Sequence, residues 1–130
     1  METNKKLIIF VVEDNLISQQ LIAKKLEAIT DAIHFFTSGE DCILELADRS
    51  PDIIVLDNTL AGKLSGLDTL KAIRVLNPEL CVIIFSARQD LATAENLSTY
   101  GHFEFVKKDE TAFKHLQNKV SARINYLHRN

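Results

Sequence analysis

Five short apolar runs, separated by segments of helical periodicity, constrain the fold of this chain more than any other feature. The runs are four to six residues long and rich in Ile, Val, Leu and Phe, which is typical of strands buried on both faces. They occupy residues 7–12, 33–36, 53–56, 80–85 and 103–106. Because a helix-length segment follows each run, we predict an α/β fold: a doubly wound, five-stranded parallel sheet with five helices.

Helical patterns fill the segments between the runs. Ile22, Leu26 and Ile29 form an apolar stripe on the first helix, and Ile17 and Leu21 lie beside it. A longer stripe marks the last helix, at Phe113, Leu116, Val120, Ile124 and Leu127. A fourth helix is expected over roughly residues 90–99 and should end at Gly101.

Capping residues indicate where three of the helices begin. Ser38 with Asp41, and Ser65 with Asp68, form S-x-x-D patterns that start the second and third helices. Asp109 can cap the start of the last helix. The helix boundaries therefore agree with the strand boundaries in predicting five βα units.

Composition and charge limit the classes of partner. The chain has 130 residues, of which 46% are hydrophobic and 25% charged, as expected for a single domain over residues 1–130 without an effector domain. The net charge of −3 gives no general attraction to nucleic acid or to an anionic membrane, and no apolar run is long enough to cross a bilayer. Cys42 and Cys81 lack motif spacing, as is usual for free thiols in a reducing compartment. We therefore predict a cytoplasmic protein that binds neither nucleic acid nor membrane.

Polar residues follow four of the five strands, at the ends that a parallel sheet brings to one edge. They are Glu13, Asp14, Asp57, Ser86 and the pair Lys107–Lys108. In a sheet of flavodoxin-like order, 2-1-3-4-5, ligands bind beyond this edge, where the order reverses between the first and third strands. Two carboxylates ~5 Å apart repel each other by about 3 kcal/mol at an effective dielectric of ~20. Gathering them at this edge therefore needs a physical reason.

A divalent cation together with a phosphoryl group supplies such a reason. Mg²⁺ prefers oxygen ligands and often joins one or two carboxylates to a phosphate. Asp57 lies in the middle of the arrangement and could act as a nucleophile that forms an aspartyl-phosphate, while a hydroxyl and an ammonium hold the remaining oxygens. An interpretation as loop residues or helix caps suits any one of these residues but not five together.

The same residues carry a resemblance to a known family. "VVEDN" supplies an acidic pair, Glu13 and Asp14, after the first strand, and "PDIIVLDNTL" supplies Asp57 after the third. "VIIFSA" ends the fourth strand in Ser86 and Ala87, and "YGHFEFVKKDE" ends the fifth in lysine. Over essentially its whole length the chain resembles the receiver domains of two-component response regulators, the CheY-like family.

Two lysines compete for the position of the family lysine. Aligning Gly101 with the family glycine selects Lys108 and puts Phe105 at the aromatic switch position. Choosing Lys107 would put Glu104 there, which is a poorer match.

The resemblance implies a metal site and a phosphorylation reaction. A histidine kinase or histidine phosphotransfer protein would donate the phosphoryl group, and Asp57 would accept it. Asp14 and Asp57 would bind Mg²⁺ directly, Glu13 would act through water, and the backbone carbonyl of Thr59 would complete the ligands. The protein would be no enzyme in the ordinary sense, since it would catalyse only its own phosphorylation and dephosphorylation.

The resemblance also implies a conformational switch. Lys108 would hold one phosphoryl oxygen, Ser86 would move to bond another, and Phe105 would swing into the space released. The face formed by the fourth helix, the fifth strand and the fifth helix would then change for a downstream protein target. The protein would be a monomer or a weak homodimer through that face.

Two further positions are those that the family uses to tune the lifetime of the phosphorylated state, Thr59 and Arg88. Thr59 offers no strong base for orienting an attacking water, and Arg88 could lie over the phosphoryl group and shield it. In the alternative, Arg88 points into solvent or pairs with Asp90. The chain departs from the family at Leu60–Gly62, where Met-Pro is common, and at Asp109, where proline usually follows the lysine.

Two other functions compete with a phosphorylated receiver. A small metal-dependent phosphatase would need a second base or a D-x-D pair, and "DNT" supplies one acid. A phosphorylation-independent, receiver-like protein-binding module would be expected to have lost the acceptor, the hydroxyl or the lysine, and all three are present.

Overall fold

The computed structural model of the chain describes residues 7–57, 60, 64–86 and 103–129. The helix expected over 90–99, its end at Gly101, and the positions Thr59 and Arg88 lie outside the described residues.

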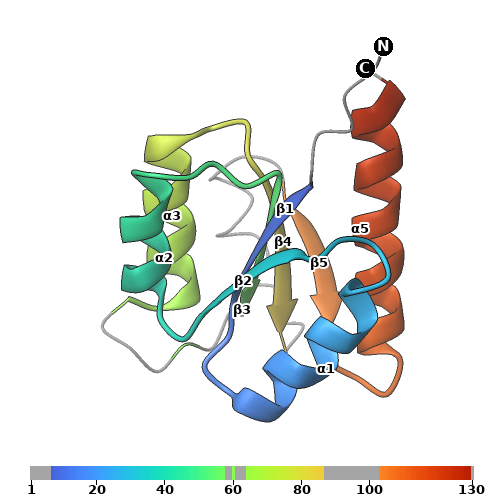
Figure 1. Cartoon of the computed structure of the whole chain (residues 1–130). Helices are drawn as coiled ribbons and strands as arrows, with labels where there is room; N and C mark the ends of the chain where they lie inside the picture. The colour runs from blue at the N-terminus through green and yellow to red at the C-terminus, as the bar shows by residue number, and fades with distance from the viewer. Residues whose placement is uncertain (1–6, 58–59, 61–63, 87–102, 130) are drawn as a thin grey trace.

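Five parallel strands form one sheet, as predicted (Figure 1). Their bounds are β1 (Ile8–Val12), β2 (Ala32–Phe36), β3 (Ile53–Asp57), β4 (Cys81–Ser86) and β5 (Glu104–Lys107). The order is β2-β1-β3-β4-β5, which confirms the flavodoxin-like arrangement and places β1 beside β3. The carboxyl ends of all five strands therefore meet at one edge, at the bottom of the view in Figure 1.

Helices cover both faces of this sheet. Their bounds are α1 (Leu16–Leu26), α2 (Gly39–Leu46), α3 (Gly66–Leu76) and α5 (Ala112–Arg129). Helices α1 and α5 pack on one face, and α2 and α3 on the other (Figure 1). Among the described residues, none of these helices is both long and apolar enough to span a membrane.

Two separate apolar cores explain why the strands lack polar alternation. Along β1, Ile9 and Val11 join the core under α1 and α5, while Phe10 and Val12 join the core under α2 and α3. All four side chains are essentially inaccessible to solvent. A strand buried on both faces must be apolar at every position, as the sequence indicated.

The stripe predicted for the first helix, Ile22, Leu26 and Ile29, packs against the core, and the two residues beside it do not. Ile22 and Leu26 are fully buried, but Ile17 and Leu21 are 68% and 44% exposed. Ile29 lies beyond the end of α1, although it still packs against the core. Only the side of the helix that faces the sheet is buried, so the neighbouring Ile17 and Leu21 stay exposed.

The predicted caps are present. The Ser38 hydroxyl accepts a hydrogen bond from the amide three residues on, at the start of α2. Ser65 and Asp68 form a reciprocal capping box at the start of α3. The Asp109 carboxylate accepts from the amide and the hydroxyl of Thr111, immediately before α5. Each cap satisfies amides that the first turn leaves without a partner.

Helices α2 and α3 approach most closely where Gly39 meets Thr69. Both residues are buried, and a Cβ at Gly39 would overlap the Thr69 hydroxyl. That hydroxyl donates to the carbonyl of Ser65 at 2.8 Å, so it is held in place. A side chain at Gly39 therefore forces the two helices apart.

We predict that Gly39→Ala destabilises the fold by about 1–3 kcal/mol, because overpacking outweighs the better helix propensity of alanine. Denaturant titration measures the change. In a Thr69→Ala background, where the obstructing hydroxyl is gone, the same substitution should cost less. Equal costs in both backgrounds would contradict the proposed steric origin.

Candidate functional site

Three carboxylates meet at the carboxyl edge of the sheet, and we call them the acid cluster: Glu13, Asp14 and Asp57. Glu13 and Asp14 follow β1, and Asp57 ends the neighbouring strand β3. One carboxylate oxygen from each residue lies within 4.8 Å of the others. Glu13 and Asp57 are only 1% and 2% exposed, whereas Asp14 is half-buried. The structure thus brings together the three acids singled out from the sequence.

The local sequence "EDN" fixes Glu13 at this edge. Its amide donates to the carbonyl of Phe36 at 2.9 Å, which carries strand pairing one residue past β1. Asn15 caps α1 by accepting from the Ser18 amide, and its own amide donates to a Glu13 carboxylate oxygen at 3.2 Å. The side-chain amide of Gln19 donates to the Glu13 carbonyl at 2.6 Å. Backbone and side chain of Glu13 are therefore both held.

Lys108 supplies the positive charge that faces the acid cluster. Its ammonium lies 3.1 Å from Glu13 Oε1 and 3.3 Å from Asp57 Oδ1. The amide of Lys108 donates to the carbonyl of Ser86 at 2.7 Å, which extends the pairing of β5 with β4. Ser86 is fully buried, while Lys107 is exposed. Alternation along the strand thus brings only one of the two lysines to the acids.

The environment perturbs the protonation of Glu13. Burial raises the pKa of its carboxyl to about 7, and a hydrogen bond and charge repulsion from Asp57 act in the same direction. The Lys108 ammonium opposes these effects by lowering that pKa. Without a further cation, the Glu13 carboxyl therefore keeps its proton to a higher pH than an ordinary glutamate does. A bound cation would favour the ionised form.

The donor set fits a hard divalent cation. At Mg²⁺–oxygen distances of about 2.1 Å, octahedral ligands lie about 3–4 Å apart, so small side-chain movements close the cluster around an ion. The three acids offer oxygen only, which suits Mg²⁺ better than softer metals. The fourth protein ligand predicted from the sequence, the carbonyl of Thr59, lies outside the described residues.

Sequence reasoning missed two residues of the site. The Lys108 ammonium lies over the ring of Phe85, 5.2 Å from the ring centroid, and the ring can stabilise the positive charge. Gln19 holds the Glu13 carbonyl from one turn into α1. Neither residue carries a motif, although Phe85 directly precedes Ser86. Phe105 is half-buried against the core under α2 and α3.

The fold and the acid edge define a class of signalling module, and residues 9–121 match the response regulator receiver domain family. The chain belongs to that family. It is 28% identical, over 85% of its length, to a protein-glutamate methylesterase/protein-glutamine glutaminase of Clostridium acetobutylicum. It is also 28% identical, over 89% of its length, to the DNA-binding transcriptional regulator NtrC of Salmonella typhimurium. The chain spans only 33% and 27% of the length of these relatives.

Solved structures give the same assignment. The receiver domain of NtrX from Brucella abortus is 28% identical, with a TM-score of 0.77 over 88% of this chain and 95% of that one. The response regulator DrrB of Thermotoga maritima superposes with a TM-score of 0.83 at 22% identity, over 94% of this chain and 54% of that one. The second likeness supports the fold alone.

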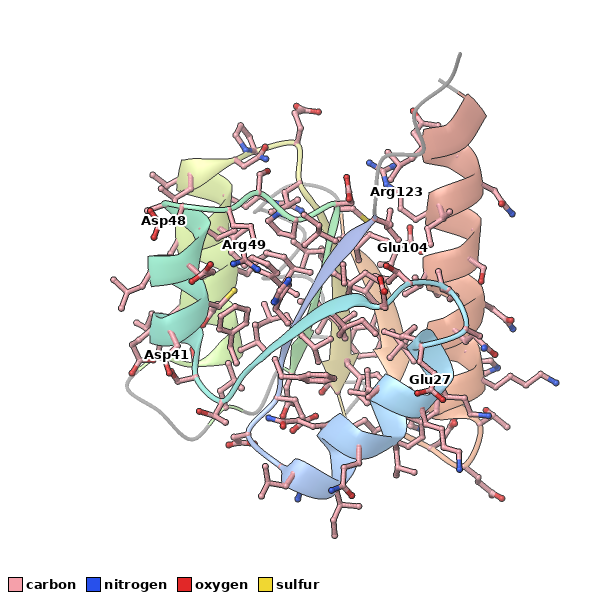
Figure 2. The ribbon with its side chains drawn as sticks, in the orientation of Figure 1. Glu27, Asp41, Asp48, Arg49, Glu104 and Arg123 are labelled. Carbon is pink, nitrogen blue, oxygen red and sulfur yellow. The ribbon has the colours of Figure 1, made fainter. Side chains whose placement is uncertain are left out.

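We predict that MgCl₂ at roughly ten times its Kd raises the thermal unfolding midpoint by about 3–6 °C. Asp14→Asn should remove most of that response, because it deletes one ligand charge. Asp48→Asn is the matched control, since Asp48 lies beyond the end of α2, away from the acid cluster (Figure 2). An undiminished response in Asp14→Asn, measured by scanning calorimetry, would rule out the acid cluster as the binding site.

Proposed function

We propose that this receiver domain accepts a phosphoryl group on Asp57 from the phosphohistidine of a histidine kinase or histidine phosphotransfer protein. The observation that carries the proposal is the position of Asp57. It is buried at the edge where strand ends converge, with a second acid and the Lys108 ammonium in contact. A structural carboxylate would need one cationic partner, but it would gain nothing from two more acids.

The chemistry is a transfer between two nucleophiles. A carboxylate oxygen of Asp57 attacks phosphorus in line, the new O–P bond forms, and the N–P bond to the donor imidazole breaks. The imidazole leaves on the donor protein and takes up a proton. Lys108 is placed to pair with one phosphoryl oxygen by exchanging its present contact with Asp57.

Magnesium is the cofactor that fits this reaction. Asp14 and Asp57 would hold it directly, and Glu13 through water, with the carbonyl of Thr59 as a further ligand. When bound, the ion supplies positive charge that offsets the charge on the phosphoryl oxygens. Because Lys108 already contacts two buried acids, a second cation would help to offset the charge of the phosphoryl group.

The phosphorylated state would signal through a protein surface. The Ser86 hydroxyl would bond a phosphoryl oxygen, and Phe105 would repack beside it. Because Ser86 pairs with Lys107 in the ladder between β4 and β5, a shift at Ser86 bears on β5 and then on α5. A downstream protein would read this face, on a monomer or a weak homodimer.

The wider proposal is a cytoplasmic phosphorelay component with no substrate other than its own phosphoryl group. It would bind neither nucleic acid nor membrane through this domain. The competing function is a phosphorylation-independent binding module. The acceptor, hydroxyl and lysine positions are all filled, so we favour the phosphorylated form.

Incubation with acetyl phosphate and Mg²⁺ tests the function directly. We expect a phosphoryl adduct in intact-mass spectra of the wild type, and none when Mg²⁺ is removed with EDTA. Asp57→Asn should give no adduct, because an amide is a far weaker nucleophile than a carboxylate. Asp48→Asn serves as the control and should react like the wild type. An adduct at equal yield in Asp57→Asn would refute the assignment.

The two lysines offer a second test. Beryllofluoride with Mg²⁺ mimics the phosphoryl group, and amide NMR shifts report the activated conformation. We predict that Lys108→Ala abolishes these shifts, whereas Lys107→Ala preserves them, because only Lys108 contacts the acid cluster. The opposite ranking would mean that strand β5 is out of register by one residue.

A further inference from the structure

A cavity of about 460 Å³ lies at the other end of the sheet, where β4 and β5 begin. Its walls come from the end of α3, the start of β4 and β5, and α5, and include Arg74, Cys81, Glu104, Lys119, Arg123 and Tyr126. Strand β4 begins at this cavity with Cys81 and ends at Ser86, so about 16 Å separates the two sites. The volume lies within the range of small-molecule sites, roughly 300–1,000 Å³.

Arg123 brings to this cavity a buried hydrogen-bond donor that has no partner among the described residues. Among the described residues its Nε is the one buried side-chain nitrogen or oxygen that lacks a hydrogen-bond partner. Leaving a buried donor unpaired costs about 1–3 kcal/mol. The guanidinium stacks 4.9 Å from the centroid of the Tyr126 ring, which fixes its plane. Figure 2 shows Arg123 and Glu104 between α5 and the sheet.

Among the described residues that line the cavity, cationic side chains outnumber acidic ones. Glu104 accepts from the Lys119 ammonium at 2.8 Å, so these two charges offset each other. Arg74 donates to the carbonyl of Leu80 at 2.6 Å, which holds a second guanidinium in the wall. Of the lining side chains, three are cationic and two, Glu79 and Glu104, are acidic.

We propose that this cavity binds a small molecule bearing a carboxylate. The carboxylate accepts from Nε and one terminal nitrogen of Arg123, in the bidentate geometry that guanidinium groups favour. The apolar part of the ligand lies against Leu80, Ile83 and Ala122, which line the same cavity. This site is separate from the acid cluster and requires neither Mg²⁺ nor phosphorylation.

Ligand-detected ¹⁹F NMR with 4-fluorobenzoate tests the proposal, without Mg²⁺ or a phosphoryl donor. We expect broadening of the ligand signal by the wild type and about tenfold weaker binding by Arg123→Gln. Arg123→Lys should also weaken binding, because lysine keeps the charge but lacks the forked guanidinium group that makes two parallel hydrogen bonds to a carboxylate. Arg49→Gln is the matched control, since Arg49 bonds to His34 and Glu45 on the other side of the sheet. The neutral 4-fluorobenzamide should bind about tenfold more weakly than the acid.

Amide shifts of labelled protein locate the ligand and show that each variant is folded. We expect shifts around Cys81, Glu104 and Arg123 and none at the acid cluster. No binding to the wild type at about 10 mM, equal binding by Arg123→Gln, or shifts centred on Lys108 would each overturn the proposal. Because no arm depends on Asp57, failure here is distinguishable from failure of the phosphorylation proposal.

Discussion

The contact of one ammonium with two buried carboxylates is the interaction on which the carboxyl edge of this domain depends. Lys108 comes from β5, while Glu13 and Asp57 come from β1 and β3, so the ammonium crosses the end of β4 to reach them. The Phe85 ring lies beneath it on the way. Four strands must therefore keep their register for the charges to meet. Without Lys108, these two buried acids would lose a cationic partner that offsets part of the cost of their desolvation.

Gathering three acids at this edge has an electrostatic cost. Burial raises the pKa of Glu13, the hydrogen bond and charge of Asp57 act in the same direction, and the Lys108 ammonium opposes the rise. A divalent cation and a dianionic phosphoryl group together add no net charge to the edge. The same geometry that strains the free protein is thus suited to a metal and a phosphoryl group at once.

Much of this arrangement could be predicted from the sequence, because burial on both faces leaves a clear signal. Strand β1 was located to within one residue, and Asp57 follows the predicted third strand directly and proves to be its last residue. The capping box of Ser65 is local and was likewise predictable. The buried side of α1 was also predictable, because the stripe of Ile22, Leu26 and Ile29 has helical periodicity.

The same distinction between local and distant information applies to the residues of the site. The acids lie at strand ends, where topology alone gathers them, so their positions in the sequence were sufficient. The contacts of Gln19 and Phe85 in the site depend on how α1 and β4 pack. Such packing cannot be recognised from the identity of a single residue. The orphaned Nε of Arg123 is a further example, since the longest apolar stripe of the chain gave no hint of a polar cavity beside it.

The two ends of the sheet are linked by the strands that they share. In the ladder between β4 and β5, Ile83 pairs with Glu104 at the cavity end and Ser86 with Lys107 at the acid end. The register that sets Lys108 against the acid cluster therefore also sets Glu104 beside Arg123. Phe105 lies between these points, half-buried in the core under α2 and α3. Since hydrogen-bonded strands slide only in steps of two residues without turning every side chain over, movement at either end must proceed by repacking side chains. A half-buried aromatic ring midway along this short strand has more room to repack than the buried Val106 beside it, in line with the switch role proposed for Phe105.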